Sequence, residues 1–316
     1  MEDRTNKRST FLLIDGNAIL HRAYHALPSL TTKDGTPTGA VFGFFSMLLK
    51  VLQEVKPAYL AITFDRPKPT FRQQLFVGYQ AHRPKMSDEL GQQIKIVHHI
   101  LENANIAIFE VDGFEADDVI GTIALKAQNA KRKTQNKEHF EVIILSGDRD
   151  MLQLVNSHVK VLAPIIGITK MVLYDEALVK EKFGVASSQI IDYKALMGDV
   201  SDNYSGVLGV GPKTAGALIA QFKTVENIYM RISELEKDDP KLAKKLAEQQ
   251  EEALLAKKLA TIVTDVPLVF DKDACFVPRI NQDAMRQQFS QYGFNSLLKR
   301  LDSVFPAKNS QPELLN

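Results

Sequence analysis

Short apolar runs rich in β-forming residues alternate with amphipathic stretches along the first half of this chain. The apolar runs cover residues 10–15, 58–65, 106–111, 140–148 and 159–164. Helical patterns lie between them, for example over residues 39–55 and 88–102. Strands that alternate with helices are typical of a parallel sheet covered on both faces. We therefore expect an α/β fold with a mostly parallel sheet.

The second half of the chain has a different pattern. The β-rich runs stop near residue 176, and residues 176–262 are almost entirely helical in pattern, interrupted by the turn-rich stretch GDVSDNYSGVLGVGPKTA (198–215). Another amphipathic helical region covers residues 286–301. We expect five parts: a flexible N-terminus (1–9), an α/β core (10–175), a helical region (176–265), a C-terminal segment that packs back on the core (266–305), and a linker or tail (306–316).

Composition restricts the class of protein. A chain of 316 residues with 45% hydrophobic residues can form about two domains with a sizeable core. The formal net charge of +1 does not by itself indicate a nucleic-acid binder. The single cysteine, Cys275, excludes an internal disulfide, and no signal peptide or long apolar run is present. We expect a cytoplasmic protein without a membrane partner.

Acidic residues follow the predicted strands. In an open α/β sheet, ligands bind at the carboxyl ends of the strands. Five segments bring carboxylates to this edge or to the start of the helical region: Asp15; Asp65; Glu115, Asp117 and Asp118; Asp148 and Asp150; Asp199 and Asp202. Taken singly, each group has an ordinary explanation, because carboxylates stabilise helix N-termini and aspartate is common in turns.

Together, these nine carboxylates are difficult to explain without cations. Two like charges about 5 Å apart cost roughly 3 kcal/mol at an effective dielectric constant of about 20. Oxygen ligands without nearby Cys or His favour Mg²⁺ or Mn²⁺ over zinc. Their number exceeds the needs of one ion, and two ions are typical of phosphodiester hydrolysis. Calcium storage is a weaker alternative, because no EF-hand loop is present.

A basic stretch offers a route for a polyanionic substrate. Residues 66–87 contain five Lys or Arg and no Asp or Glu, with three aromatic residues interleaved: Arg66, Lys68, Arg72, Arg83 and Lys85, with Phe71, Phe76 and Tyr79. This composition fits a surface that binds single strands. The alternative is a solvated basic loop with its aromatic residues in the core. The basic stretch 126–137 lacks aromatic residues and fits a solvated loop.

A glycine-rich turn in the helical region predicts a contact to DNA backbone. Gly206, Gly209 and Gly211 precede Pro212 at the start of a predicted helix, and Lys213 follows. This resembles the hairpin of a helix-hairpin-helix motif, in which backbone amides bind a phosphate without reading sequence. A tight turn between helices is the alternative.

Several motifs together resemble one family. LLIDGNAILHRAYHAL, TFDRPKPTFR, GYQAHRP, FEADDVIGTIA, SGDRDMLQLV and LMGDVSDN…GVLGVGPKTA occur in order between about residues 10 and 300. They are similar to the 5′-nuclease domain of bacterial DNA polymerase I, part of the flap endonuclease family. The resemblance implies a PIN-like α/β core, a helical arch over about residues 66–100, and a helix-three-turn-helix region that binds duplex DNA. It also implies two Mg²⁺ (or Mn²⁺), in some members K⁺ at the hairpin, and removal of 5′ flaps and RNA primers.

The resemblance assigns roles to residues of this chain. Its first metal region matches Asp15, Asp65, Glu115, Asp117 and Asp118, and its second matches Asp148, Asp150, Asp199 and Asp202. The family's arch pattern Tyr-Lys-x-x-Arg matches at Tyr79 and Arg83, but Gln80 replaces the lysine; Arg72 and Lys85 are nearby cations. Contacts to DNA are expected from Arg22, Gln80, Gly206, Gly209, Gly211, Lys213 and Thr214. The typical SDNIPG of the family is SDNYSG here.

We therefore expect a monomeric, structure-specific 5′ nuclease that acts on DNA with a 5′ flap, a nick or an RNA primer, either free-standing or joined to a polymerase domain. Two alternatives remain. A junction-binding module with weakened catalysis would explain Gln80, although a binder has no need for nine clustered carboxylates. A PIN-type ribonuclease would share the core but would not require the hairpin motif.

Overall fold

The computed structural model describes residues 9–129 and 140–306. Its centre is a six-stranded sheet with the order β3-β2-β1-β4-β5-β6. The strands are β1 (Ser9–Asp15), β2 (Tyr59–Thr63), β3 (Ala107–Phe109), β4 (Phe140–Leu145), β5 (Val159–Ile166) and β6 (Lys170–Tyr174). The first five are parallel to one another, and β6 pairs antiparallel with β5. The expected α/β fold with a mostly parallel sheet is confirmed.

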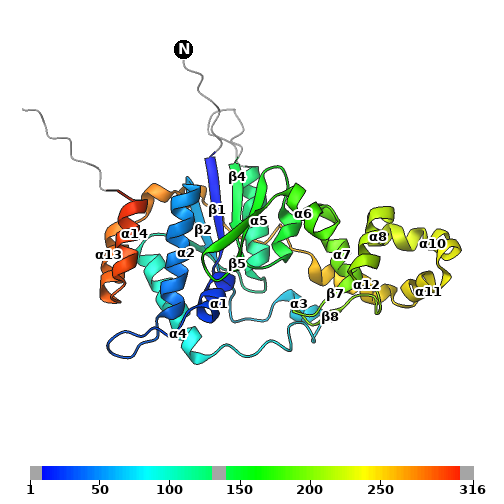
Figure 1. The fold of residues 1–316 in the computed structure, drawn as a ribbon, viewed down its shortest axis with the longest axis horizontal. Coiled ribbons are helices and arrows are strands. Elements are labelled where there is room, and N and C mark those ends of the chain that lie inside the picture. The colour runs from blue at the N-terminus through cyan, green and yellow to red at the C-terminus, as the bar shows by residue number, and fades with distance from the viewer. Residues whose placement is uncertain (1–8, 130–139, 307–316) are drawn as a thin grey trace, which may run out of the picture.

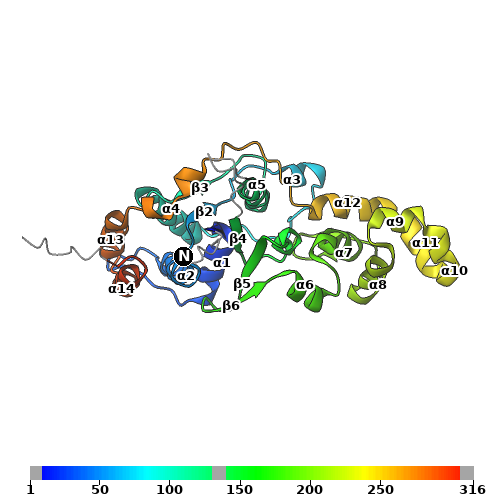
Figure 2. The same ribbon diagram turned by 90° about the horizontal axis from the view of Figure 1, so that it is seen from above.

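Alternation along the central strand explains why helices cover both faces. Phe11 and Leu13 of β1 belong to one buried apolar cluster, whereas Leu12 and Ile14 belong to the other. All four side chains are at most 1% exposed. Because successive side chains of a strand point to opposite faces, a continuous apolar run requires cover on both. Figure 2 shows helices on the two sides of the sheet.

One face is covered by helices from both ends of the chain. They are α1 (Gly16–Ala26), α2 (Gly39–Val55), α4 (Asp88–Asn103), α13 (Gln282–Gln291) and α14 (Asn295–Val304). The last two pack against α4 and α2 (Figure 1). The predicted helix over residues 286–301 is therefore two helices, and the break lies at Gly293, whose φ of +71° is in the left-handed region that favours glycine.

The other face is covered by α5 (Ala116–Gln128). The helical region shares the apolar cluster on this face. That region contains α6 (Glu176–Phe183), α7 (Ile190–Met197), α8 (Pro212–Phe222), α9 (Val225–Met230), α10 (Ile232–Asp238), α11 (Pro240–Glu248) and α12 (Gln250–Ala260). Short 3₁₀ turns are η1 (Asp150–Leu154), η2 (Ser187–Gln189), η3 (Lys272–Cys275) and η4 (Val277–Arg279). Figure 1 shows α8, α10 and α11 extending away from the sheet.

Two β elements differ from the sequence expectation. The sequence gives no clear signal for β6, because this edge strand has no fully buried residue. The prediction that β structure ends near residue 176 is wrong in one detail. A short antiparallel ribbon joins β7 (Gly198–Asp199) to β8 (Tyr204–Ser205).

The segment expected to form a helical arch is helical only at its ends. Its helices are α3 (Phe71–Leu75) and α4, and residues 76–87 between them form turns and irregular backbone. Gln80 has a φ of +56°, which an α-helix cannot contain. Figure 1 shows this segment running along the lower edge of the molecule, where β1 ends and α1 begins.

Some expectations concern residues outside the described ranges. These are the flexible N-terminus, most of the basic stretch 126–137 and nearly all of the C-terminal tail. Within the described ranges, no helix combines the length and apolar character needed to cross a bilayer.

Candidate active site

Asp15 is the last residue of β1 and the N-cap of α1. Its Oδ1 accepts a hydrogen bond from the Ala18 amide at 2.9 Å, and its Oδ2 accepts one from Ser146 Oγ at 2.8 Å. Burial raises the pKa of Asp15 to about 7, and the charges of Asp65 and Asp148 add to this shift. A buried carboxylate beside two others is a position that favours a cation.

Ser146 connects Asp15 to the loop after β4. Its Oγ donates to Asp15 and accepts from the Asp148 amide at 3.0 Å. Asp148 Oδ1 in turn accepts from the Asp150 amide at 2.8 Å. Ser146 was not among the predicted site residues. Its position at the end of β4 was the available signal.

The loop after β2 and the start of α5 bring three more carboxylates to the same edge. Asp65 Oδ1 accepts from the Ala116 amide at 2.7 Å, so the loop after β2 is tied to the helix N-terminus. Glu115 is the N-cap of α5, and burial raises its pKa to about 7. Burial, followed by the charges of Asp148, Asp15 and Glu115, raises the pKa of Asp117 well above its ordinary range. These segments therefore converge, as their places in the sequence suggest.

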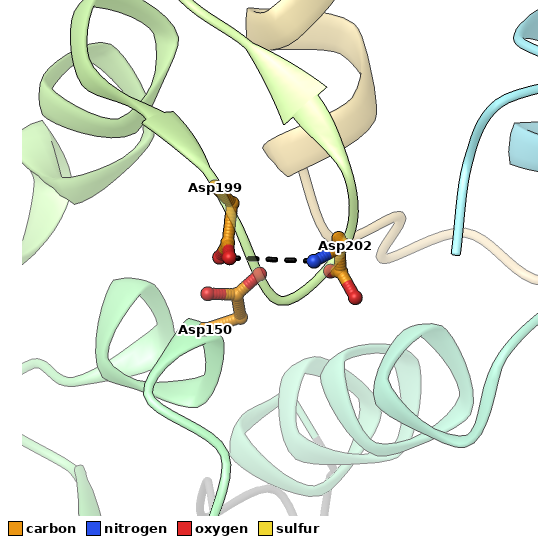
Figure 3. A group of neighbouring side chains, drawn as sticks. All are labelled: Asp150, Asp199 and Asp202. Carbon is orange, nitrogen blue, oxygen red and sulfur yellow. Dashed lines mark hydrogen bonds between the residues drawn. The ribbon is translucent and has the colours of Figure 1, made fainter. Parts of the chain in front are cut away.

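A second acidic group lies beside the first. Asp150, Asp199 and Asp202 each offer one carboxylate oxygen, and these three oxygens lie within 4.8 Å of one another. Asp150 comes from η1, whereas Asp199 and Asp202 come from β7 and the turn that follows it (Figure 3). Asp199 Oδ1 accepts from the Asp202 amide at 3.4 Å, which fixes the turn. Among the described residues, this is the carboxylate set with the spacing of a cation site.

Lys194 supplies a positive charge inside the second group. Its Nζ contacts the carboxylate of Asp150 and lies 2.5 Å from Asp199 Oδ2. Burial opposes its charged form, but Asp150 and Asp199 hold the pKa of Lys194 above its ordinary range. Lys194 was not among the predicted site residues. A lysine within the largely buried sequence IIDYKALM of α7 was the signal for it.

Three side chains of the 76–87 segment converge on Asp202. Arg83 Nη2 lies 2.6 Å from Asp202 Oδ1, Gln80 Nε2 donates to the same oxygen at 3.1 Å, and the Tyr79 hydroxyl lies 3.3 Å from Oδ2. The Gln80 amide also donates to the Asp202 carbonyl at 2.9 Å. Tyr79 is buried and also contacts Glu115, at 3.2 Å, so it links the two acidic groups.

Arg72 and Asp118 differ from the rest of the predicted site. The Arg72 guanidinium donates two hydrogen bonds to Asp118, both at 2.8 Å, and further ones to the carbonyls of Leu259 and Thr261. Asp118 also accepts from the Val263 amide at 2.8 Å. Arg72 is 2% exposed and Asp118 is 0% exposed. Arg72 was expected as a cation near the arch and Asp118 as a metal ligand. In the structure Arg72 pairs with Asp118 and, at 3.5 Å, with Glu115, and both Arg72 and Asp118 also bond to backbone.

The remaining Lys and Arg residues of the 66–87 stretch are either paired with a carboxylate or exposed to solvent. Arg66 and Lys68 pair with Asp112 at 2.9 and 2.6 Å, whereas Lys85 is exposed. Arg22, an expected DNA contact, donates its Nε to the Gly167 carbonyl at 2.6 Å. The stretch is therefore less positive toward solvent than its composition suggests.

The glycine-rich hairpin is held by the helices around it. Gly209 has a φ of +80°, and an added Cβ would lie 2.7 Å from Lys245 Nζ. Gln249 Oε1 accepts from the Leu208 amide at 2.7 Å. Gly211 is the N-cap of α8, and Lys213 in its first turn is exposed. Lys245 and Gln249 were missed, because only the fold brings α11 and its C-cap to the hairpin.

A cavity of about 530 Å³ opens beside the second acidic group. Its lining includes Arg83, Asp148, Asp150, Lys194, Asp199 and Asp202. The cavity thus combines five of the charged groups described above with Asp148, which connects to the first acidic group.

Comparison with known proteins identifies the family. The model for the 5′-3′ exonuclease N-terminal resolvase-like domain matches residues 10–184, and the model for the 5′-3′ exonuclease C-terminal SAM fold matches residues 185–283. The chain belongs to the 5′–3′ exonuclease family. It is therefore a phosphodiester hydrolase, and the expected relation to the 5′ nuclease of DNA polymerase I is confirmed. The matches over both regions do not support a PIN-type ribonuclease lacking the hairpin.

Relatives occur as separate proteins and within longer ones. The chain is 36% identical over 300 residues to the 5′-3′ exonuclease of Aquifex aeolicus (strain VF5), which covers 94% of this chain and 96% of that protein. It is 40% identical over 312 residues to DNA polymerase I of Bacillus subtilis (strain 168), covering 98% of this chain and 34% of that protein. The chain thus spans about a third of the length of its polymerase relatives.

Solved structures share the fold. A bacteriophage T5 5′-exonuclease with bound divalent metal ions (zinc) has a TM-score of 0.65 at 20% identity, covering 92% of this chain and 99% of that one. A T5 flap endonuclease in a pseudo-enzyme–product complex with DNA and metal ions has a TM-score of 0.65, also at 20% identity, covering 93% and 99%. At this identity the likeness establishes the fold alone.

Proposed function

We propose that this 5′–3′ exonuclease is also a structure-specific 5′-flap endonuclease. Its expected substrates are DNA with a 5′ flap or a nick and RNA primers in replication and repair. The observation that carries the proposal is the convergence of Asp150, Asp199 and Asp202 with the carboxylates after β1, β2 and β4 at one edge of an exonuclease fold. Arg83 lies at the same cavity and pairs with Asp202, so it would add positive charge beside a phosphodiester placed there.

Two divalent cations, Mg²⁺ or Mn²⁺, are expected at this edge. Asp15, Asp65, Glu115 and Asp117 are assigned to the first cation, and Asp148, Asp150, Asp199 and Asp202 to the second. The donor set fits hard cations, because within the described residues these groups offer oxygen ligands without Cys or His. When bound, such ions activate water and stabilise charge on the phosphate and the leaving oxygen.

The raised pKa values are the test of this fit. Burial raises the pKa values of Asp15, Glu115 and Asp150 to about 7, so added positive charge would favour the ionised form of these carboxylates. Lys194 and Arg83 compensate part of the second group. Bound cations would supply the remaining charge.

The basic and polar residues of the chain divide into two roles. Arg83 is half exposed, lies at the cavity and is assigned to the scissile phosphate, with Tyr79 and Gln80 fixing its turn against Asp202. Lys85 is exposed and is assigned to the approaching strand. The pair Arg72–Asp118 is assigned to holding α3 against α5 and the segment after α12, instead of to the reaction.

The hairpin is assigned to the duplex. Gly206, Gly209 and Gly211 bring backbone close to a phosphate, and Lys213 and Thr214 lie in the first turn of α8, where the helix dipole favours an anion. A K⁺ held by carbonyls of this hairpin belongs to the same proposal. Arg22, on α1, is the remaining DNA contact proposed.

The proposal also covers the domain bounds, the oligomeric state and the location of the chain. We place the catalytic core at residues 10–175, the helix-three-turn-helix region at 176–265 and the returning segment at 266–305. The chain acts as a monomer in the cytoplasm, consistent with its single cysteine. The relation to DNA polymerase I allows a polymerase domain in the same protein.

Cleavage and binding measured on one substrate test the function. A 5′-labelled flap duplex is incubated under single-turnover conditions with Mg²⁺ or with EDTA, beside a binding titration. Release of a discrete 5′ fragment with Mg²⁺ alone supports the proposal. Asp148→Asn is expected to lose cleavage and keep binding, whereas Lys213→Ala is expected to weaken binding. Equal loss of cleavage and binding in Asp148→Asn would contradict this division.

Gln80 favours the second candidate, a junction-binding module with weakened catalysis. Its amide occupies a position for which the family typically uses a lysine. The same experiment separates the two candidates, because tight binding without fragment release in either Mg²⁺ or Mn²⁺ would favour the binding module.

A further inference from the structure

Tyr204 stands at the point where this chain departs from the SDNIPG typical of its family. It lies in β8, two residues after Asp202, and is 5% exposed. Its ring is stacked near that of Tyr79, with centroids 6.4 Å apart and an angle of 16° between the planes. Ala256, Leu259 and Ala260 complete this small apolar cluster. The ring is therefore well packed. This packing does not explain why the side chain carries a hydroxyl group.

The hydroxyl of Tyr204 lies within electrostatic range of the second acidic group. Asp199 and Tyr204 are direct partners in the antiparallel ribbon β7–β8. Directly opposite residues of such a ribbon project their side chains from the same face. The carboxylate of Asp199 belongs to the acidic group, so the Tyr204 side chain lies on the same side of the ribbon. The charges of Lys194, Asp150, Asp199 and Asp202 all act on this hydroxyl.

The same hydroxyl is buried without a hydrogen-bond partner among the described residues. Buried polar groups are almost always satisfied, and ordered water is a common partner where protein atoms offer none. A small cation such as Mg²⁺ keeps several water molecules when carboxylates bind it. An isoleucine at this position, as in the family's typical sequence, offers no polar atom to such water.

We propose that the Tyr204 hydroxyl hydrogen-bonds a water molecule in the hydration shell of the divalent cation held by Asp150, Asp199 and Asp202. Tyr204 is thus a positioning residue of the second cation site. This inference rests on the proposed function, because it requires the second cation. The hydroxyl acts through water and leaves the carboxylate oxygens free to bind the ion.

Calorimetric titration with Mn²⁺, without DNA, tests the inference. Tyr204→Phe keeps the ring and its packing and removes only the hydroxyl. Tyr229→Phe is the matched control, because the Tyr229 hydroxyl is also buried without a partner among the described residues but lies on α9, where Glu252 is the charge that acts on it. Loss of an outer partner of a metal ligand typically weakens affinity about 10-fold or more. We expect that change at the cation site of Asp150, Asp199 and Asp202 in Tyr204→Phe and Tyr204→Ile, and no change in Tyr229→Phe.

Thermal unfolding in EDTA separates this role from a structural one. Tyr204→Phe is expected to unfold at the wild-type temperature or above it, since it removes a buried hydroxyl that lacks a partner without metal. Equal Mn²⁺ affinities in Tyr204→Phe, Tyr229→Phe and wild type would overturn the role of Tyr204 while leaving the two-cation proposal intact. A wild-type chain that binds one Mn²⁺, with no change in Asp150→Asn, would overturn the second cation and this inference with it.

Discussion

Arg72 and Asp118 form a two-point ion pair in which both N–O distances are 2.8 Å and both side chains are almost completely buried. The pair joins α3 to α5, and Arg72 continues to the carbonyls of Leu259 and Thr261. Three separate segments therefore depend on one guanidinium group. Breaking such a buried pair is strongly destabilising, and it would leave Arg72 with only the longer contact to Glu115, at 3.5 Å, as a carboxylate partner.

Asp118→Asn should therefore reduce the free energy of unfolding by more than it reduces the free energy of metal binding. We expect a loss of about 3–5 kcal/mol in the free energy of unfolding. Urea denaturation measures it. Arg286→Gln is the control, because the pair Arg286–Asp302 is exposed and should contribute about 1 kcal/mol or less. If Asp118→Asn unfolds like wild type and loses Mn²⁺ affinity, Asp118 is a metal ligand, as its place in the sequence suggests.

Lys194 occupies the second acidic group when no metal is present. Lys194→Met should lower the unfolding temperature in EDTA, because Asp150 and Asp199 then repel each other without compensation. Added Mn²⁺ should restore more stability in this variant than in wild type, by at least about 1 kcal/mol.

Lys257→Met is the matched control for Lys194→Met. Lys257 forms comparable pairs with Asp192 and Glu226, away from the acidic edge. It should lose stability in EDTA while keeping the wild-type gain on adding Mn²⁺. An equal Mn²⁺ gain in both lysine variants would contradict the role of Lys194 as an internal counter-charge.

Much of the acidic edge could be predicted from sequence because it depends on strand ends. Asp15 ends β1, Asp65 follows β2, and Asp148 follows β4, and parallel strands bring their carboxyl ends to one edge whatever the details of packing. The family resemblance added the roles of Asp199 and Asp202, which lie outside the sheet.

Pairing between side chains could not be predicted in the same way. Asp117 and Asp118 are neighbours in the first turn of α5. One step along a helix rotates the direction of the side chain by about 100°. That rotation directs Asp118 to Arg72 and leaves Asp117 beside Asp15 and Asp148. The lysine of α7 was missed because one of its partners, Asp150, is 44 residues earlier and on a separate element.

Metal binding should release protons near neutral pH. Burial raises the pKa values of Asp15, Glu115 and Asp150 to about 7, so each is partly protonated at pH 7 without metal. A cation requires the ionised form. We expect proton release on metal binding at pH 7 and less release at pH 9. Titrations in buffers of different ionisation enthalpy measure this release, and equal release at both pH values would contradict the shifts.

The same raised pKa values predict how the stability of the metal-free chain changes with pH. A carboxyl group whose pKa is raised by folding stabilises the native state fully only below its unfolded pKa. That contribution is lost as the pH rises from about 4 through about 7. The metal-free chain should therefore be less stable at pH 8 than at pH 5.5, and Mg²⁺ should reduce the difference.

Gln80→Lys should increase the rate of single-turnover flap cleavage. Gln80 Nε2 already lies 3.1 Å from Asp202, so a lysine there would bring a positive charge to the edge of the cavity. A charged donor that meets developing charge on the phosphate is worth about 10-fold or more in rate. The left-handed backbone at residue 80 is the same for both side chains, so the turn should persist.

Gln80→Met separates charge from side-chain length in this experiment. It should cleave no faster than wild type, because it removes the hydrogen bond to Asp202 without adding charge. Flap affinity is measured beside the rate in all three proteins, so that a change in binding is not taken for a change in chemistry. If Gln80→Lys and wild type cleave at the same rate with the same affinity, Arg83 already provides the charge that the lysine supplies elsewhere in the family, and Gln80 is no sign of weakened catalysis.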